Sequence, residues 1–238
     1  SLLLEYISWK GVFVFLALIG VIVLIFSFRL KESLSVENRL QGSIFSTFLT
    51  FGVIIKNRLF MSYVGIQSFL LGSMFAYIAA SPFIFQSFYG LSAFIFSLCF
   101  GANGAALVIG ANVGGKLSNR KALAIGVLAF VVAALYTIAV LIIQPYWLFV
   151  EIGFFAMLLL MGITFPAISS LAMESERQYA GSASALLGFA PFFLGGVVSP
   201  LVGIGNIFYS TSFVILVCAL LALSIYWVIR HKIPTSAE

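Results

Sequence analysis

Seven long apolar windows constrain this chain more than any other feature, because each is long enough to cross a lipid bilayer. A helix needs about 20 apolar residues to span the hydrocarbon core. The windows cover residues 11–28, 60–80, 93–115, 122–143, 146–170, 179–203 and 208–229. Only 8% of the 238 residues are charged, against about 25% in a soluble domain. The sequence therefore predicts an all-α, polytopic membrane protein with seven transmembrane helices.

The connections between the windows divide the chain into one helix and a block of six. We expect a first helix in residues 1–28, a cytoplasmic linker in 29–59, a six-helix bundle in 60–232 and a tail in 233–238. Within the linker, residues 43–55 are apolar but too short to span, which suits either an interfacial helix or a flexible connection. The chain begins at Ser1 with no signal peptide before the first window, so we interpret it as an amino-terminally truncated piece of a longer polypeptide.

The lysines and arginines predict the orientation in the membrane, since short cytoplasmic loops are enriched in them. If the first window enters from outside, all of these residues except Lys10 fall on the inner side. The loops 81–92, 144–145 and 205–206 carry no charge. We therefore expect a cytoplasmic carboxyl terminus. The net charge of +5 is then a sign of topology and of contact with anionic membrane lipid rather than of nucleic-acid binding.

The inventory of reactive side chains argues against an enzyme or a metalloprotein. The chain has one histidine, His231, and no aspartate, so neither a His/Asp/Glu metal site nor a Ser-His-Asp triad can be assembled from it. Cys99 and Cys218 lie inside apolar windows, where we expect small buried hydrophobic side chains. We expect no metal and no cofactor.

Two windows are rich in small residues, which allow close helix packing in lipid. In 179–203 they form one stripe, from which Phe192 also projects; in 93–115 they occupy both sides, so we expect that helix to be enclosed by neighbours. Because glycine and proline permit bending, the first of these helices either bends during function or is only tightly packed. The candidate bending residues are Gly188, Pro191, Gly195 and Pro200.

A few polar and aromatic side chains within the windows are candidates for a binding site. An amide, a phenol and a thioether share one face of the window 60–80, which suits either a pocket for mixed apolar and polar molecules or plain helix packing. Asn103 lies near mid-membrane, where an amide is costly unless it is bonded, so it either makes an interhelical hydrogen bond or contacts a ligand. The candidate cavity residues are Tyr63, Gln67, Met74, Asn103, Phe189 and Phe192.

Glu151 is the only carboxylate inside a predicted span. Acids within the membrane are candidates for function, and this one could handle protons. It lies near the outer end of its window, however, so it could also simply reach water.

The loop between the third and fourth windows carries the most specific local pattern. Residues 115–120 read GKLSNR and resemble the G-x-L-[SA]-D-R loop signature of the major facilitator superfamily, with Asn119 in place of the usual acid. The matching residues are Gly115, Leu117, Asn119 and Arg120.

Further matches resemble the Bcr/CflA group of bacterial drug-resistance transporters within that superfamily. They are WKGVF at 9–13, ASPFIFQ at 80–86, YGLS at 89–92, FPA at 165–167 and AGSASALLGF at 180–189. The resemblance covers essentially the whole chain, which would be the sixth to twelfth helices of a twelve-helix protein. It implies the carboxyl-terminal half of a major facilitator fold, with residues 1–28 as the last helix of the amino-terminal half.

By implication the protein is a multi-pass transporter of the bacterial inner membrane. The resemblance implies secondary active efflux of small, drug-like amphipathic compounds, by proton antiport with alternating access. The partners implied are the substrate, protons, membrane lipid and the missing amino-terminal half, which would hold the family's usual proton-coupling acids; Arg120 would be a cytoplasmic anchor.

Other functions remain open at this point. An uptake facilitator for a nutrient usually needs a dense polar or cationic site, and no lysine or arginine occurs within the last six windows. A seven-helix receptor or sensor fits the helix count. The uncharged outer loops and the lack of an attached signalling domain argue against this class. An intramembrane enzyme lacks paired acids or a triad.

Overall fold

The computed structural model describes residues 9–29 and 50–233, and the chain divides into two units, Ser1–Ser46 and Thr47–Glu238. The described part of the first unit is the helix α2 (Trp9–Ser27), whose apolar stretch Phe13–Ser27 is shorter than the other apolar helices. This confirms a helix in the first window. Of the predicted linker and tail, residues 30–49 and 234–238 lie outside the described residues, and 50–54 are helical.

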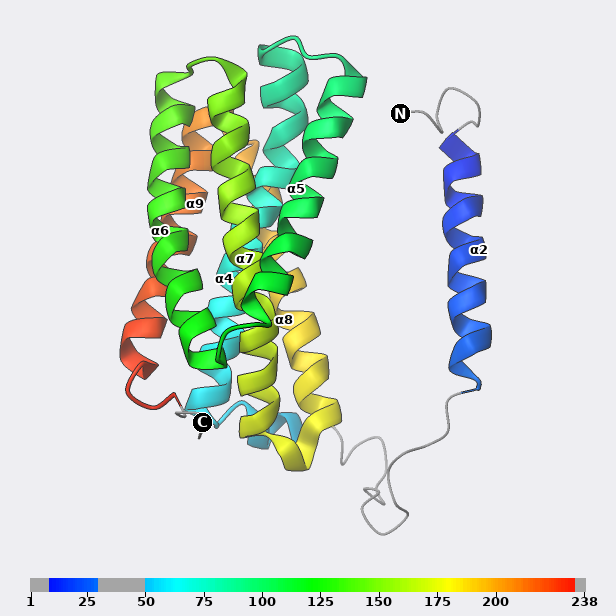
Figure 1. The fold of residues 1–238 in the computed structure, drawn as a ribbon, viewed down its shortest axis with the longest axis vertical. Coiled ribbons are helices and arrows are strands. Elements are labelled where there is room, and N and C mark those ends of the chain that lie inside the picture. Colours follow the sequence, from blue (N-terminus) through cyan, green and yellow to red (C-terminus); the bar gives the residue numbers. More distant parts are fainter. Residues whose placement is uncertain (1–8, 30–49, 234–238) are drawn as a thin grey trace. The chain divides into compact units, whose positions relative to one another are not determined.

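Within its described residues, the second unit contains six helices long and apolar enough to cross a membrane. They run up and down in an all-helical bundle (Figure 1). The elements are α4 (Arg58–Pro82), η2 (Phe83–Phe88), α5 (Ala93–Gly114), α6 (Asn119–Ile143), α7 (Trp147–Ser175), η3 (Arg177–Tyr179), α8 (Ala180–Val202) and α9 (Ile207–Ile229). Each helix matches one of the last six predicted windows, so the predicted fold class is confirmed.

Local sequence signals explain where several helices begin and turn. The side chains of Asn57, Ser92 and Asn206 accept hydrogen bonds from backbone N–H groups in the first turns of α4, α5 and α9, as short polar residues do at helix starts. Gly90 and Gly205 have φ values of 69° and 76°, a conformation that glycine adopts without steric cost. These two glycines allow the tight turns that lead into α5 and α9.

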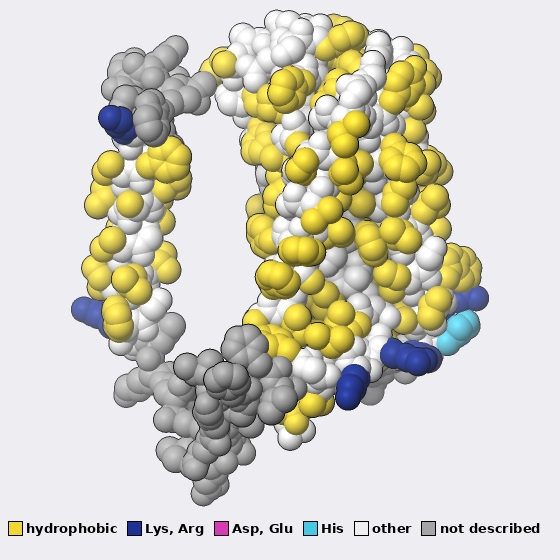
Figure 2. Space-filling model, turned by 180° about the vertical axis from the view of Figure 1, so that it is seen from behind, with side chains coloured by type: hydrophobic (Ala, Val, Ile, Leu, Met, Phe, Trp, Pro, Cys, Tyr) yellow, Lys and Arg dark blue, Asp and Glu magenta, His cyan; other side chains and the backbone are white. Residues whose placement is uncertain are grey.

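The lysines and arginines of the second unit gather at one end of the bundle, which we call the charged end (Figure 2). They are Lys56, Arg58, Lys116, Arg120, Lys121, Arg177, Arg230 and Lys232. The turns at the opposite, uncharged end are residues 89–92, 144–146 and 203–206. Hydrophobic side chains cover the length of the bundle between the two ends (Figure 2), as expected of a surface that faces lipid.

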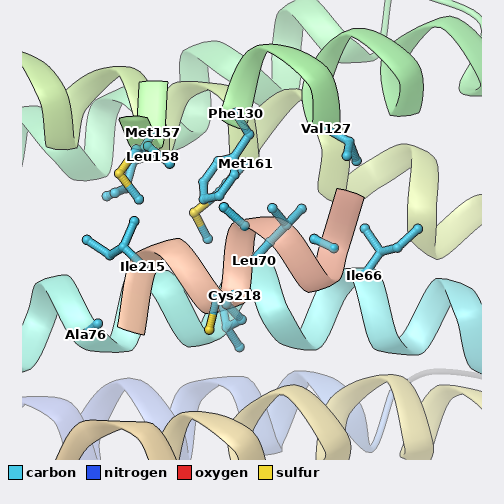
Figure 3. Close-up of a cluster of buried hydrophobic side chains, with 14 of the residues drawn as sticks. Ile66, Leu70, Ala76, Val127, Phe130, Met157, Leu158, Met161, Ile215 and Cys218 are labelled. Atoms are coloured by element: carbon cyan, nitrogen blue, oxygen red, sulfur yellow. The ribbon is translucent and has the colours of Figure 1, made fainter. Parts of the chain in front are cut away.

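The core of the bundle lies between α4, α6, α7 and α9. Figure 3 shows Leu70 of α4, Phe130 of α6, Met161 of α7 and Ile215 of α9 among the side chains that meet there. All four are at most 1% exposed. The helices α4 and α7 are the most buried of the six, and α5 and α8 are the least.

Glycines bring α5 and α7 into backbone contact. A Cβ atom added at Gly110 would overlap the carbonyl oxygen of Leu159, and one at Gly162 would overlap that of Leu107. A Cβ at Gly114 would overlap the carbonyl oxygen of Ile163. We call Gly110, Gly114 and Gly162 the α5–α7 seam. Such close approach needs residues without side chains, and it adds to dispersion between helices in lipid.

The opposite side of α5 and part of α8 are open. A Cβ at Gly101 or Gly104 of α5, or at Gly181 or Gly188 of α8, would meet no atom of the described chain within 4 Å. The expectation that α5 is enclosed on both sides is therefore wrong for this unit, because only its α7 side packs. We call these two surfaces the open faces of α5 and α8.

The small-residue stripe of α8 is also divided. Pro191 and Gly195 are buried, and a Cβ at Gly195 would overlap the Phe75 ring of α4, whereas Gly188 is exposed. The helix continues through Pro191 and Pro200 without a break from Ala180 to Val202. Bending at these residues stays a prediction.

Candidate functional site

Three polar side chains from three helices meet inside the bundle. The Asn103 Nδ2 atom of α5 donates hydrogen bonds to the Tyr77 hydroxyl of α4, at 2.9 Å, and to the Glu151 Oε2 atom of α7, at 3.2 Å. Asn103 is 1% exposed, Glu151 is 7% exposed and Tyr77 is 2% exposed. We call these three residues the polar cluster.

Aromatic rings surround the polar cluster. The Tyr77 ring packs against Phe154 of α7, with 4.7 Å between ring centroids, and stacks on Phe100 of α5 at 5.8 Å. Phe154 contacts Phe85 in turn. The carboxyl and the amide therefore lie in an apolar environment. Along α5, Asn103 is two turns away from Gly110 of the α5–α7 seam.

The hydrogen bonding of the cluster is incomplete. The Glu151 Oε1 atom and the Asn103 Oδ1 atom are both buried and have no hydrogen-bond partner. Within the described residues the one ion pair joins Arg177 to Glu174, at 3.1 Å and exposed to solvent, so Glu151 has no cationic partner there. A buried carboxyl without a cationic partner is costly in its ionised form. The polar cluster is therefore the candidate functional site of the bundle.

The predicted residues Asn103 and Glu151 are thus brought together, while the sequence analysis missed Tyr77. Asn103 makes the interhelical hydrogen bond that was one of its two expected roles. Glu151 lies inside the bundle rather than at a surface. A tyrosine in an apolar helix resembles an ordinary core residue, so only the fold reveals that its hydroxyl meets the amide.

The other predicted cavity residues lie on α4 and α8, and their role in a cavity stays a prediction. Tyr63 is fully buried, and its hydroxyl has no hydrogen-bond partner. Gln67 and Met74 are half-buried, and the Gln67 Oε1 atom also lacks a partner. Phe189 and Phe192 are 64% and 65% exposed. The Phe192 ring packs edge-on against Phe75 of α4, at 5.8 Å.

The hollows at the bundle surface include two with aromatic side chains in their walls. One, of about 350 Å³, is lined by Phe51, Ala185, Leu186 and Phe189, so it includes one of the predicted residues. The other, of about 560 Å³, lies at the uncharged end between η2 and the turn from α8 to α9, where Phe83, Phe88 and Asn206 contribute to its wall. The second hollow could not be predicted from the sequence, because its walls come from segments far apart in the chain.

A tyrosine hydrogen bond joins two turns at the uncharged end. The Tyr89 hydroxyl donates to the Pro145 carbonyl oxygen at 2.8 Å. Burial raises the pKa of the Tyr89 phenol above its ordinary value. The phenol therefore stays protonated at neutral pH and remains a donor in this contact.

Polar contacts at the charged end tie α7 to two neighbouring helices. The Asn119 Nδ2 atom, at the start of α6, donates to the Ser170 hydroxyl of α7 at 2.9 Å. The Asn57 Nδ2 atom, before α4, donates to the Glu176 Oε1 atom at 2.6 Å. In the loop pattern, Gly115 is the residue that ends α5, Leu117 is half-buried and Arg120 is exposed. Asn119 therefore links two helices where the family signature has an acid.

Replacing Asn57 by alanine is expected to destabilise the bundle by about 2 kcal/mol. The change removes the N-cap of α4, worth about 1 kcal/mol, and the charge-assisted bond to Glu176. Asn206 provides a matched control, because its side chain caps α9 with the same geometry and no hydrogen bond to another helix is recorded for it in the described part. Thermal unfolding in detergent should show a smaller loss for N206A than for N57A. Equal losses would show that the Glu176 bond contributes nothing.

Comparison with known proteins places this architecture in context. Residues 1–200 match the family described as Major Facilitator Superfamily. The chain is 38% identical over 210 residues to the uncharacterized MFS-type transporter YdgK of Bacillus subtilis, covering 86% of this chain and 52% of that protein. It is 26% identical over 215 residues to a bicyclomycin resistance protein homolog of Haemophilus influenzae, covering 84% and 52%. The chain therefore spans about half the length of these two relatives.

Proposed function

Because this chain belongs to the major facilitator superfamily, we propose that it forms one half of a secondary active transporter that exports small amphipathic compounds in exchange for protons. The observation that carries this proposal is the pair of open faces on α5 and α8, which flank the central helices α4 and α7. In a superfamily of membrane transporters, such faces are suited to meet a second set of helices around a shared pathway. The Bcr/CflA resemblance and a relative named for bicyclomycin resistance favour drug-like substrates.

The partner of the open faces is proposed to be the amino-terminal half of the same transporter. The exposed glycines of α5 and α8 leave the backbone accessible to another helix. The relatives from Bacillus and Haemophilus are about twice as long as the region they share with this chain, which leaves room for such a half. We also propose the bacterial inner membrane as the location, with the charged end and the carboxyl terminus in the cytoplasm.

The substrate contacts are proposed to come from α4 and α8. Gln67 and Met74 are half-buried, and Phe189 and Phe192 are exposed. A thioether, an amide and aromatic rings suit molecules with both apolar and polar parts. Tyr63 and Asn103 lie deeper, and we assign them to the wall behind this surface.

Movement during transport is proposed to involve the small residues of α8 and the loop between α5 and α6. Gly188, Pro191, Gly195 and Pro200 are the proposed bending points of α8. The loop residues Gly115, Leu117, Asn119 and Arg120 are proposed to anchor the bundle at the cytoplasmic surface, where Asn119 already holds α6 to α7.

Transport into inverted membrane vesicles tests this function. Vesicles with the complete transporter that contains this chain should accumulate an amphipathic dye only under an imposed proton gradient. Replacing Phe192 by alanine should lower kcat/KM about tenfold, because the exposed ring would be buried against the substrate in the complex, and losing part of that burial costs about 1.5 kcal/mol.

The matched control is Phe213→Ala on α9, since Phe213 is 67% exposed on a helix that we do not assign to the pathway. It should transport like the wild type. Equilibration of a sugar without any gradient, in place of dye accumulation, would instead support an uptake facilitator.

A further inference from the structure

We propose that the polar cluster is a proton-binding site, in which Glu151 takes up a proton and shares it with the amide of Asn103. The assignment of this proton to transport rests on the proposed antiport function. It develops the prediction that Glu151 could handle protons, and it gives the carboxyl-terminal half a proton site in addition to the coupling acids expected in the missing half.

The first argument is a count of donors and acceptors. With Glu151 ionised, the Asn103 amide donates to the carboxylate and to the Tyr77 hydroxyl, and two buried oxygens, Glu151 Oε1 and Asn103 Oδ1, remain without a donor. A proton on Glu151 Oε1 supplies the missing donor. A protonated carboxyl and a primary amide can then form two parallel hydrogen bonds, one in each direction. One proton thus removes both unsatisfied oxygens.

The second argument is the absence of any other neutralising group in the part of the bundle that the structure describes. The titratable side chains that face Glu151 are Tyr77 of α4 and Cys99 of α5, which lies one turn before Asn103. The helix α6 packs on another side of α7, where Thr137 meets Gly153. Neither a lysine, an arginine nor a histidine lies among these residues. No basic side chain among them neutralises the carboxylate, and a proton on Glu151 Oε1 does so while also supplying the missing donor.

The position of the cluster connects proton binding to the contact between α5 and α7. The seam glycines hold these helices together towards the charged end, and the cluster joins them two turns further towards the uncharged end. Protonation adds a hydrogen-bond donor between the helices at this place, whereas loss of the proton leaves two buried acceptor oxygens without a donor. The deprotonated form therefore favours an arrangement in which water reaches the carboxylate.

Glu151→Gln in the complete transporter tests the proposal, because glutamine imitates the protonated carboxyl in shape and hydrogen bonding. Reconstituted E151Q is expected to bind the dye and exchange it across the membrane without a gradient, but to lose at least tenfold of its gradient-driven accumulation. Glu174→Gln is the matched control, since Glu174 is an exposed acid on the same helix. It should keep wild-type accumulation.

Infrared difference spectroscopy gives a readout that does not depend on transport. The wild type and E174Q should show one titrating carboxylic-acid carbonyl component beyond those of any acids in the amino-terminal half, and E151Q should lack that component. If E151Q keeps gradient-driven accumulation, or if its titrating band is identical to that of the wild type, the assignment to Glu151 is wrong. If the wild type moves dye without responding to a gradient, the antiport function is wrong, and the infrared titration alone then decides whether Glu151 binds a proton.

Glu151→Asp covers the case in which E151Q does not fold. The aspartate side chain is one methylene shorter, so its carboxyl lies further from Asn103. The pH at which accumulation is half-maximal should therefore shift from the wild-type value. The infrared band should shift in the same sense. An unchanged pH profile together with an unchanged band would overturn the proposal.

Discussion

Replacing Gly110 by alanine is expected to destabilise the six-helix unit by about 3 kcal/mol. The new methyl group would overlap the Leu159 carbonyl oxygen, and it would lie 3.0 Å from the Gly162 Cα atom. These are backbone atoms of α7, so a change of side-chain conformation cannot relieve the overlap and the two helices must separate. Overpacking in a well-packed interior costs about 1 to 3 kcal/mol and occasionally more. We expect the upper end of this range, because separation also loosens the contacts at Gly114.

The measurement is the yield and thermal midpoint of the purified chain in detergent, followed by size-exclusion chromatography. A loss of about 3 kcal/mol lowers the midpoint by roughly 6 to 12 °C for a chain of this size. Gly104→Ala is the control, because Gly104 lies on the same helix and a Cβ there meets no described atom within 4 Å. If G110A is as stable as G104A, the close approach of α5 and α7 is wrong.

Replacing Asn103 by leucine is expected to cost about 2 kcal/mol or more, although leucine is the more hydrophobic residue. The change removes the only hydrogen-bond donor that reaches Glu151 in the described chain and one partner of the Tyr77 hydroxyl. A buried polar group without a partner costs about 1 to 3 kcal/mol. Both groups remain buried after the substitution, so the gain from burying leucine does not offset the loss.

Asn112 offers a control for this substitution on the same helix. Its Nδ2 atom donates to the Val108 carbonyl oxygen within α5, and its side chain is exposed. Asn112→Leu should therefore leave the thermal midpoint nearly unchanged, or raise it slightly in detergent. Should N103L match N112L, the polar cluster would have no role in stability.

The helices of the second unit could be predicted from sequence because the bilayer leaves few alternatives. In lipid every backbone polar group must be paired internally, so a long apolar window predicts a helix whatever its glycine content. The helix boundaries differ from the predicted windows by a few residues, mostly at the charged end, where α7 continues to Ser175. Polar residues there still fit a helix because they have reached the membrane surface.

The direction in which each small-residue face packs could not be predicted. Gly104 and Gly110 are both glycines in an apolar stretch of α5, so the sequence does not distinguish them. Gly104 faces open space, whereas Gly110 faces the backbone of α7. Hydrophobic periodicity cannot separate them, because both sides of α5 are apolar. Asn103 and Glu151 could be identified as unusual because they are polar residues in apolar windows. Their hydrogen bond to each other, and that of Asn103 to Tyr77, depend on how α4, α5 and α7 cross.

The open faces sort the glycines of this chain into two groups with different mutational tolerance. Substitutions at Gly110, Gly114 and Gly162 act on the unit itself and should reduce its accumulation in the cell. A screen for accumulation should not detect substitutions at the exposed glycines, and only a selection for transport should. These glycines are Gly101, Gly104, Gly181 and Gly188. A scan scored both ways would therefore show which residues of the open faces contact the proposed amino-terminal half.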